Sequence, residues 1–519
     1  MEFKTDNSYI KSIKCADVYT ESQADYTIPD YLGDVRKILF TEASLRPSGR
    51  FAGGEEVEFS GVVVYNVIYL DSEGKLCSVE FTSDYDYSIK CSGDNYNDSI
   101  SDTRVSNYSL RLTGPRKINA KASLVGSVKL SENVTVAVTG DAFTDGKAPE
   151  INKGSANVRM SKTSSVRERE FAESVARLDG AIADEVKVVH SFAECLVDDV
   201  KCDEDKAVIK GRLCLFGVIC NGDEPAYGVE KSISFEEGVE FEEISPDMHL
   251  IPHLSVTSLK SSVNADDAGC EVVLSAILEL CVIGEGNQSV ELVLDGYCTD
   301  CLTDNTYDSF GYSSLQDVAS VKENHSAEIE RSEIEADNIR EIVFFSSTPK
   351  IESVEQENGI VSISGEVRYS GVASEMVGDK ISYVGIKFSS PFSVNVNIDC
   401  HNCNEINIET EIHSSNASAT VDADKLYATC TLECIVVASC EESRAVLSSM
   451  NCCEGEESST NEAKITVYYP APNETLFEVA KRFRTSCLKV AQDNDITESV
   501  FAADNPQGGL SGIKKLIIY

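Results

Sequence analysis

The sequence predicts a mainly β fold, in which three tandem β-rich, sandwich-like domains are followed by a small α+β domain. Two strand patterns, each written three times at nearly constant spacing, predict the three domains. A helical periodicity in the last part of the chain predicts the fourth, with the order strand, helix, helix, strand. A chain of 519 residues is long enough to bury several such cores.

The first strand pattern surrounds a glycine. Apolar side chains alternate with others along 57–69, which is the period of a strand, and Gly61 lies in the middle of that segment. Gly211 and Gly365 occupy the same place in two similar segments, 150 and 154 residues further along. A glycine inside a strand usually marks a bulge or a close approach of two backbones. Three glycines at one register therefore indicate a repeated domain.

The second strand pattern has the same period. It is centred on Leu124, Leu278 and Leu432, which are separated by 154 residues each time. Together the two patterns predict three repeats of ordinary domain size. The expected bounds of the four domains are 20–150, 165–305, 325–453 and 464–519.

Polar segments separate the repeats. Linkers are predicted at 146–169, 304–337 and 452–463, where the apolar period fades. At the start of the first repeat, Pro29 and Gly33 exclude a long helix, and we expect an extended stretch, a turn and a short helical piece up to Leu39.

Composition excludes several classes of function. With 45 basic and 87 acidic residues the net charge is −42, which repels phosphate backbones and anionic lipids, so we expect no nucleic-acid binding and no electrostatic docking to membranes. No signal peptide and no apolar run of membrane-spanning length is found, which predicts a cytosolic protein without direct membrane insertion. The sequence also lacks the common nucleotide, zinc-protease and hydrolase motifs, so we expect a non-enzymatic protein without a cofactor.

Cysteines supply the best candidates for chemistry. The 19 cysteines are spread along the chain, and in a reducing compartment we expect them to be thiols. Cys298 with Cys301, and Cys400 with Cys403, have the CxxC spacing of half a zinc site or of a redox pair. Each pair lies in a loop of a different repeat, and neither has a second half. Thiols without metal are the favoured prediction, with zinc binding and redox chemistry left as alternatives.

The last domain is predicted from helix signals. A short strand at 465–469 is followed by two helical stretches and a closing strand at 515–518. Thr475 and Glu478 have the spacing of a capping box at the first helix. The apolar residues of this helix recur at the spacing i, i+3, i+4, i+7 and give it one buried stripe. They are Leu476, Val479, Ala480 and Phe483.

Three motifs mark the first repeat: IPDYLGDVRKIL at 28–39, SGVVVYNVIYLDSEG at 60–74 and GPRKINAKA at 114–122. With these motifs the repeat resembles the SPOCS domain, which occurs in tandem in spore-coat morphogenetic proteins of clostridia. The second and third repeats keep the strand patterns and lack the Pro-Arg-Lys motif. The last domain resembles a LysM domain in the order of its elements, in NETLF at 473–477 and in NDI at 494–496.

These resemblances imply an adaptor of spore-coat assembly. Such a protein works in the cytoplasm of the mother cell and holds the coat at the forespore surface. Its LysM domain contacts the ATP-hydrolysing protein of the coat's basement layer, and other coat proteins are further partners. The alternative is a peptidoglycan-binding protein that grips N-acetylglucosamine, which would need export. The implied partner or glycan groove consists of Asn473, Glu474, Thr475, Leu476, Phe477, Asn494, Asp495, Ile496 and Thr497.

Departures from the LysM pattern favour a protein partner over a glycan. Glycan-binding members commonly have Gly-Asp-Thr-Leu before the first helix, where this chain has Asn-Glu-Thr-Leu. The side chain of Asn473 and the longer one of Glu474 are expected to crowd a shallow sugar site. Leu476, Phe477 and Ile496 are expected to offer a partner an apolar centre, unless they only fill the core of the domain.

Overall fold

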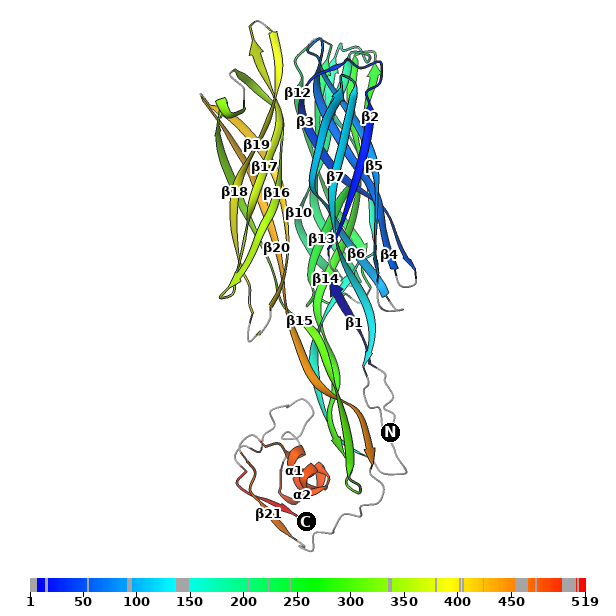
Figure 1. Cartoon of the computed structure of the whole chain (residues 1–519), viewed down its shortest axis with the longest axis vertical. Helices are drawn as coiled ribbons and strands as arrows, with labels where there is room; N and C mark the ends of the chain where they lie inside the picture. The colour runs from blue at the N-terminus through cyan, green and yellow to red at the C-terminus, as the bar shows by residue number, and fades with distance from the viewer. Residues whose placement is uncertain are drawn as a thin grey trace.

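The computed structural model is mainly β, as predicted, with antiparallel sheets throughout and two short α-helices near the C-terminus. The molecule is elongated, with the sheets gathered in one body and the C-terminal domain at the far end (Figure 1). Within the part of the chain that the structure describes, no helix combines the length and the apolar character that a membrane crossing requires. The described residues are 7–14, 17–53, 56–90, 96–136, 149–203, 205–222, 224–242, 244–334, 338–378, 380–400, 403, 406–422, 424–452, 465–471, 474–496, 510 and 513–519.

Three sheets of three strands are each centred on the strand that carries a repeated glycine. In every case the flanking strands are its neighbours in sequence, so each sheet is a simple antiparallel meander. The strands of these sheets are β3 (Val35–Gly53), β4 (Glu56–Asp71) and β5 (Leu76–Lys90); β10 (Val186–Asp203), β11 (Lys206–Asn221) and β12 (Tyr227–Glu240); and β16 (Ile339–Glu357), β17 (Ile360–Val377) and β18 (Lys380–Asn397).

Three further sheets are centred on the second repeated pattern. The central strands β7, β14 and β20 each pair with the strand before them and with strands from the start of the same third of the chain, which are two strands for β7 and β14 and one long strand for β20. Each of these sheets packs on one glycine-centred sheet, and a separate apolar core lies between the two layers. The strands are β1 (Asn7–Lys14), β2 (Val18–Thr27), β6 (Tyr96–Gly114) and β7 (Lys117–Val136); β8 (Glu150–Thr163), β9 (Arg167–Asp179), β13 (His249–Asp266) and β14 (Gly269–Tyr297); and β15 (Thr303–Glu330), β19 (Ile406–Asp422) and β20 (Lys425–Cys452).

The repeated glycines mark a close approach at a bulge, as their position in the strand predicts. A Cβ atom at Gly365 would lie 2.0 Å from the carbonyl oxygen of Lys350, and the corresponding distances to backbone oxygens at Gly211 and Gly61 are 2.5 and 2.7 Å. In all three sheets the adjoining strand has a bulge directly opposite the glycine. Any larger residue would push the two backbones apart, so the packing of the sheet by itself explains why these positions are glycine.

Two predicted linkers are wrong. Residues 150–163 of the first form β8, and most of the second lies in β15, which runs from Thr303 to Glu330 and is followed by a single 3-10 turn, Arg331–Ile334. Both strands are rich in polar residues, which hides the apolar period: many side chains of β15 face water, whereas most of those of β8 are buried or half-buried against neighbouring strands. The short helical piece expected before Leu39 is also wrong, since β3 begins at Val35. The third linker, apart from Cys452 at the end of β20, lies outside the described residues.

Arg116 explains why two motifs of the first repeat occur together. This residue lies in the turn between β6 and β7 and reaches the loop that joins β2 to β3. Its guanidinium group donates to the backbone oxygens of Pro29 and Leu32, the latter at 2.9 Å, and pairs with Asp34 at 2.8 Å. The arginine of the GPRK motif therefore fixes the conformation of the IPDYLGD loop, and both motifs have a structural role.

The three sandwiches share one apolar cluster, called the hub below. After the same bulge in β3, β10 and β16, the chain places Phe40, His190 and Phe344 at equivalent positions. Contacts between sandwiches run in a ring, from β5 to β10, from β12 to β16 and from β18 back to β3. The repeats therefore pack side by side around a pseudo-threefold centre. The buried hub residues are Leu39, Phe40, Ile68, Leu70, Val189, Val218, Ala226, Val343, Phe344, Val372 and Tyr383.

A stalk leaves the sandwiches at one end. It is built from β8 with the second half of β14, and from the first half of β15 with the second half of β20, and these two ribbons contact each other. Their inner faces bury a small apolar core that includes Val158, Leu292 and Phe310. Figure 1 shows the stalk leading from the sandwiches to the C-terminal domain.

His190 makes the hub sensitive to acid, and replacing it by phenylalanine is expected to remove this sensitivity. Burial lowers the pKa of His190 to about 4, from an ordinary value of 6.5. Below pH 6.5 this histidine takes up a proton in the unfolded chain but stays neutral in the folded one. The free energy of unfolding therefore falls as the pH approaches 4, by up to about 3 kcal/mol. Phe40 and Phe344 show that an aromatic ring fits this position in the other two sandwiches.

The measurement is urea unfolding of the wild type and of His190→Phe at pH 7 and pH 4.5. Taking the difference between the two proteins cancels the pH dependence of the many carboxylates. We expect the advantage of the variant to grow by about 2 kcal/mol between the two pH values. The exposed His249, replaced by phenylalanine, serves as control and should show no such growth. A pH-independent difference for His190→Phe would contradict the prediction.

Candidate functional site

The elements of the C-terminal domain follow the predicted order. They are β21 (Thr466–Tyr468), α1 (Leu476–Phe483), α2 (Cys487–Asp493) and β22 (Leu516–Ile518), and the two strands pair antiparallel. The predicted capping box is present: the Thr475 hydroxyl accepts from the Glu478 amide at 3.2 Å, and the Thr475 amide donates to the Glu478 carboxylate at 2.8 Å. The predicted stripe of α1 faces the core, with Leu476, Val479 and Ala480 buried and Phe483 half-buried.

The apolar residues of the predicted groove belong to the interior of the domain. Leu476 is only 2% exposed and packs among the residues of both helices and β22, so the alternative that it fills the core holds for this residue. Phe477 is half-buried against Tyr297 of the stalk, with ring centroids 5.2 Å apart in an edge-to-face arrangement. Ile496 is half-buried against the same core. The expected apolar centre of a binding groove is therefore used inside the protein.

Glu474 does not crowd a sugar site. Its side chain is turned inward and buried, where its carboxylate accepts from the Tyr468 hydroxyl at 2.9 Å and from the Ala471 amide at 2.8 Å. It also forms an ion pair with Arg482 at 3.0 Å. A buried carboxylate needs such partners because it has lost its water. Glu474 thus fixes the turn before α1, and Asn473 lies outside the described residues.

Asn494 also has a structural role. Its side-chain amide donates to the backbone oxygens of Val490 and Ile517 at 2.8 Å, and its side-chain oxygen accepts from the Ile517 amide at 2.6 Å. It ties the end of α2 to β22. Asp495 is exposed with a left-handed backbone, and Thr497 lies outside the described residues. Both halves of the predicted groove reach the same core, but their described polar side chains mostly hold the domain together.

The domain is fixed to the tip of the stalk. Tyr297, at the end of β14, is buried and donates from its hydroxyl to the Thr485 carbonyl at 2.7 Å. Burial raises the pKa of Tyr297 further above its ordinary value, which keeps this donor protonated. Beside it, the ammonium group of Lys481 lies 2.6 Å from the Asp295 carboxylate. Nothing in the strand pattern around Tyr297 distinguishes it from a residue of a sandwich core, so sequence reasoning missed it.

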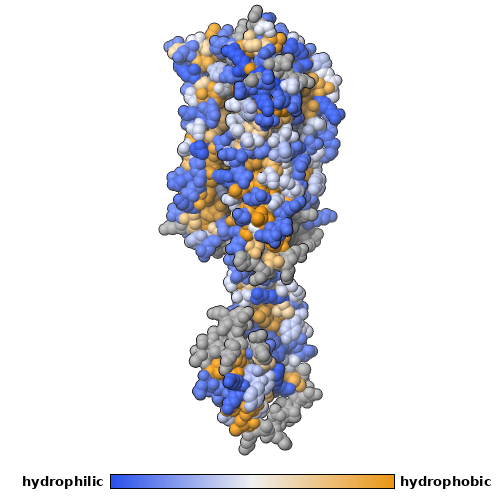
Figure 2. Space-filling view, turned by 90° about the vertical axis from the view of Figure 1, so that its left-hand side faces the viewer, coloured by the Kyte–Doolittle hydropathy of each residue, from blue (hydrophilic) through white to orange (hydrophobic). Residues whose placement is uncertain are grey.

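An apolar surface faces outward from the pair of strands β21 and β22. Side chains alternate across a strand, so while Tyr468, Leu516 and Ile518 point to the helices, the residues between them point to water. Figure 2 shows hydrophobic side chains at the surface of this lower domain. We call this surface the ribbon face; it consists of Ile465 (56% exposed), Val467 (53%), Tyr469 (70%), Tyr519 (59%) and the half-buried Ile517.

The charge of this domain differs from that of the rest of the chain. Residues 464–519 contain 7 of the 45 basic residues but only 6 of the 87 acidic ones. Lys514 and Lys515, both exposed, directly precede β22. The strongly acidic sandwiches would repel an acidic partner, whereas the C-terminal domain, which is nearly neutral, would not repel it.

The CxxC pairs do not form a common site. Cys403 is joined in a disulfide to Cys440 of β20, with Cα atoms 5.9 Å apart, and Cys301 is also disulfide-bonded, so the expectation of thiols is wrong for these residues. Cys298 is buried in the stalk core, and Cys400 is half-buried, with a pKa raised by burial and by the charges of Asp317 and Asp399. Among the described residues, no three histidine, cysteine or acidic side chains are gathered in a way that could hold a metal ion.

No protein-family model matches the chain, and no curated protein matches it.

Proposed function

We propose that this protein is a non-enzymatic adaptor of spore-coat assembly, which holds the coat at the forespore surface from the cytoplasm of the mother cell. In this proposal the three sandwiches form one rigid body, and the stalk presents the C-terminal domain to the ATP-hydrolysing protein of the coat's basement layer. Other coat proteins bind the body. The SPOCS and LysM resemblances of the sequence support the choice of system.

The ribbon face is the observation that carries the proposal. Four of its side chains are each more than half exposed and lie on one small face: Ile465, Val467, Tyr469 and Tyr519. Grouped apolar and aromatic side chains of this kind are typical of protein interfaces, where tyrosine is enriched. A partner that covers this face removes the apolar surface from water, which supplies most of the binding free energy. The proposed binding surface is therefore the outer face of β21 and β22 and not the groove predicted from the sequence.

The roles of Glu474 and Asn494 support a protein partner over a glycan. A sugar site needs polar side chains that are free to donate to or accept from hydroxyl groups. The polar atoms of Glu474 and Asn494 already have partners inside the domain. A glycan would gain little from them, whereas an apolar protein surface requires no such groups.

The contact with the stalk gives the adaptor its mechanical continuity. Tyr297, Asp295 and their partners join the C-terminal domain to strands that run without interruption into the second and third sandwiches. Force or position is thereby transmitted from a partner on the ribbon face to the whole body, and no flexible segment needs to carry it.

The test uses the full-length chain with Val467→Glu and measures its affinity for the purified basement-layer ATPase by titration calorimetry. A charge in the centre of the interface should weaken binding by about 100-fold or more, as for other central interface residues. Val377→Glu is the matched control, because Val377 is similarly exposed (59%, against 53% for Val467) and lies in the third sandwich. Unchanged affinity of Val467→Glu, or tight binding of N-acetylglucosamine oligomers by the wild type, would overturn the proposal.

A further inference from the structure

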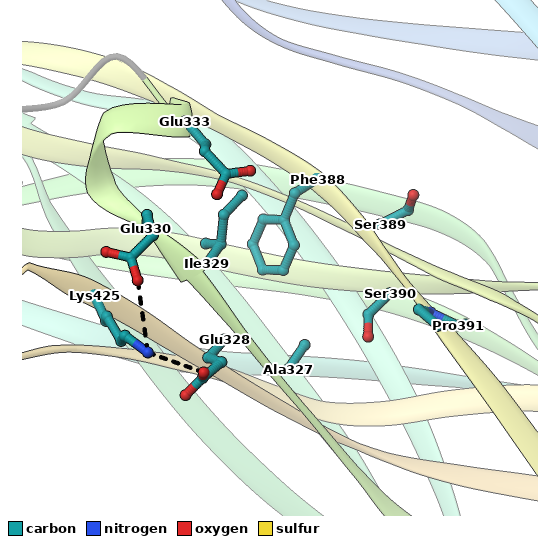
Figure 3. Close-up of a pocket in the computed structure, with 10 residues that line it drawn as sticks. All are labelled: Ala327, Glu328, Ile329, Glu330, Glu333, Phe388, Ser389, Ser390, Pro391 and Lys425. Carbon is teal, nitrogen blue, oxygen red and sulfur yellow. Dashed lines mark hydrogen bonds and ion pairs between the residues drawn. The ribbon is translucent and has the colours of Figure 1, made fainter.

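A cavity of about 410 Å³ opens at one edge of the third sandwich. Its walls are β15 and β18, which are edge strands of the two sheets, together with the 3-10 turn after β15 and the first residue of β20 (Figure 3). We call it the slot. It is lined by Ala327, Glu328, Ile329, Glu330, Glu333, Phe388, Ser389, Ser390, Pro391 and Lys425.

Strand register identifies the equivalent place in the first sandwich. Ile329 lies opposite Leu426, and Tyr26 lies opposite Ile118, where Leu426 and Ile118 hold the same position in the second repeated pattern. Across the core, Phe388 and Phe81 are also equivalent. Each is four residues before the aromatic residue that faces a repeated glycine, Phe392 opposite Gly365 and Tyr85 opposite Gly61.

The first sandwich fills this place with an aromatic ring. Tyr26 stacks on Phe81 with ring centroids 4.5 Å apart and planes within 7° of parallel. Phe81 is thereby covered, with 7% of its surface exposed, and its inner face stacks on Tyr65 at 5.2 Å.

The third sandwich lacks the outer ring. Phe388 stacks on Tyr369 at 5.1 Å, as Phe81 does on Tyr65, but the residue at the position of Tyr26 is Ile329, which has no ring. Figure 3 shows Ile329 beside Phe388 at the mouth of the slot. Phe388 is only half-buried. The slot is therefore the space of a missing aromatic side chain, with an aromatic floor still in place.

The rim of the slot is acidic. Glu328, Glu330 and Glu333 surround it, and Lys425 pairs with the first at 2.9 Å and with the second at 3.5 Å. Glu333 has no ion-pair partner among the described residues. A single lysine against three carboxylates leaves the rim negative, which attracts a cation from a partner.

We propose that the slot binds an aromatic side chain of a partner protein, carried on an extended segment in which basic residues flank the aromatic one. The aromatic ring stacks on Phe388 as Tyr26 stacks on Phe81, the basic residues pair with the rim glutamates, and the edge strands offer unpaired backbone groups to the segment. This is a second interaction site, which is independent of the ribbon face and of the basement-layer ATPase.

The test uses the peptide Ac-Gly-Lys-Trp-Lys-Gly-NH2 and the full-length chain. The chain contains no tryptophan, so the fluorescence of the peptide reports its binding directly. We expect a saturable blue shift on titration with the wild type. The peptide with glutamate in place of both lysines should bind at least about tenfold more weakly, since its charge has the same sign as that of the rim.

Ile329→Tyr is the decisive variant, because the new tyrosine would fill the slot with an aromatic ring of the protein itself, as Tyr26 does in the first sandwich. It should fold, with an unfolding midpoint at least as high as that of the wild type, and should lose binding by about tenfold or more. Ile182→Tyr, at an exposed position outside the slot, should bind as the wild type does, and so should Val467→Glu. Equal binding by Ile329→Tyr, or no difference between the two peptides, would overturn the proposal. A wild-type dimer that Ile329→Tyr dissociates in sedimentation would also overturn it, because the occupant would then be a second copy of this chain.

Discussion

Replacing Arg159 by methionine is expected to lower the free energy of unfolding by about 3 to 5 kcal/mol. Arg159 lies in β8 at the head of the stalk and is 6% exposed. Its guanidinium group binds both oxygens of Glu285 at 2.9 and 3.0 Å and one oxygen of Glu409 at 2.9 Å. Because Glu409 belongs to β19, this network joins the second sandwich to the third.

The cost comes from the charges that are left behind. Burial lowers the pKa of Arg159, but the hydrogen bonds and charges of Glu285 and Glu409 outweigh this effect and raise the pKa above its ordinary value, so the group stays charged. Glu285 is fully buried, and the substitution removes the two hydrogen bonds, at 2.9 and 3.0 Å, and the positive charge that Arg159 supplies to its carboxylate. An uncompensated buried carboxylate is much more costly than the loss of an exposed ion pair.

Urea unfolding at pH 7, followed by far-ultraviolet circular dichroism, measures this effect. Arg212→Met is the matched control, because Arg212 and Asp198 form an ion pair in which both side chains are about half exposed. It should cost less than about 1 kcal/mol. Adding Glu285→Leu to Arg159→Met should recover part of the loss, since the stranded charge is removed. Equal effects of Arg159→Met and Arg212→Met would contradict the prediction.

Replacing Phe344 by alanine is expected to cost a similar amount, about 3 to 5 kcal/mol, and to loosen the contact between all three sandwiches. Phe344 is 7% exposed at the centre of the hub. It contacts the rings of Phe40, His190 and Phe192, with centroids 4.8, 5.0 and 6.3 Å away. The three rings come from the first and second sandwiches, so the cavity left by alanine lies where all the repeats meet.

Two measurements separate this effect from a local one. Urea unfolding gives the loss of stability, and small-angle scattering in water should show a larger radius of gyration while circular dichroism still reports a β-rich protein. Tyr31→Ala is the control, because Tyr31 is aromatic but 84% exposed, and it should stay within about 0.5 kcal/mol of the wild type. An unchanged radius of gyration, together with a loss of less than about 1 kcal/mol in the free energy of unfolding, would contradict the role of the hub as the junction of the three repeats.

Local patterns were sufficient for part of the C-terminal domain but not for its candidate site. The capping box of Thr475 and Glu478 depends on contacts three residues apart, which the sequence displays directly. Whether Phe477 faces a partner or the stalk depends on Tyr297, which is 180 residues away in the chain. The burial of Glu474 likewise depends on Tyr468 and Arg482 approaching it once the strands and α1 have packed.

The sequence by itself determined the strand patterns, their threefold repetition and the role of the repeated glycines, because side-chain alternation and backbone approach are properties of single strands and their nearest neighbours. Only the tertiary structure decided that the polar segments at 150–163 and 303–330 are strands, since their polar residues hide the apolar period and their partners in β14 and β20 are distant in the chain. It also decided that three sandwiches close around Phe40, His190 and Phe344, and that Ile329 leaves a space where Tyr26 leaves none. Such packing depends on which apolar side chains of different repeats meet in space, and no local pattern records that.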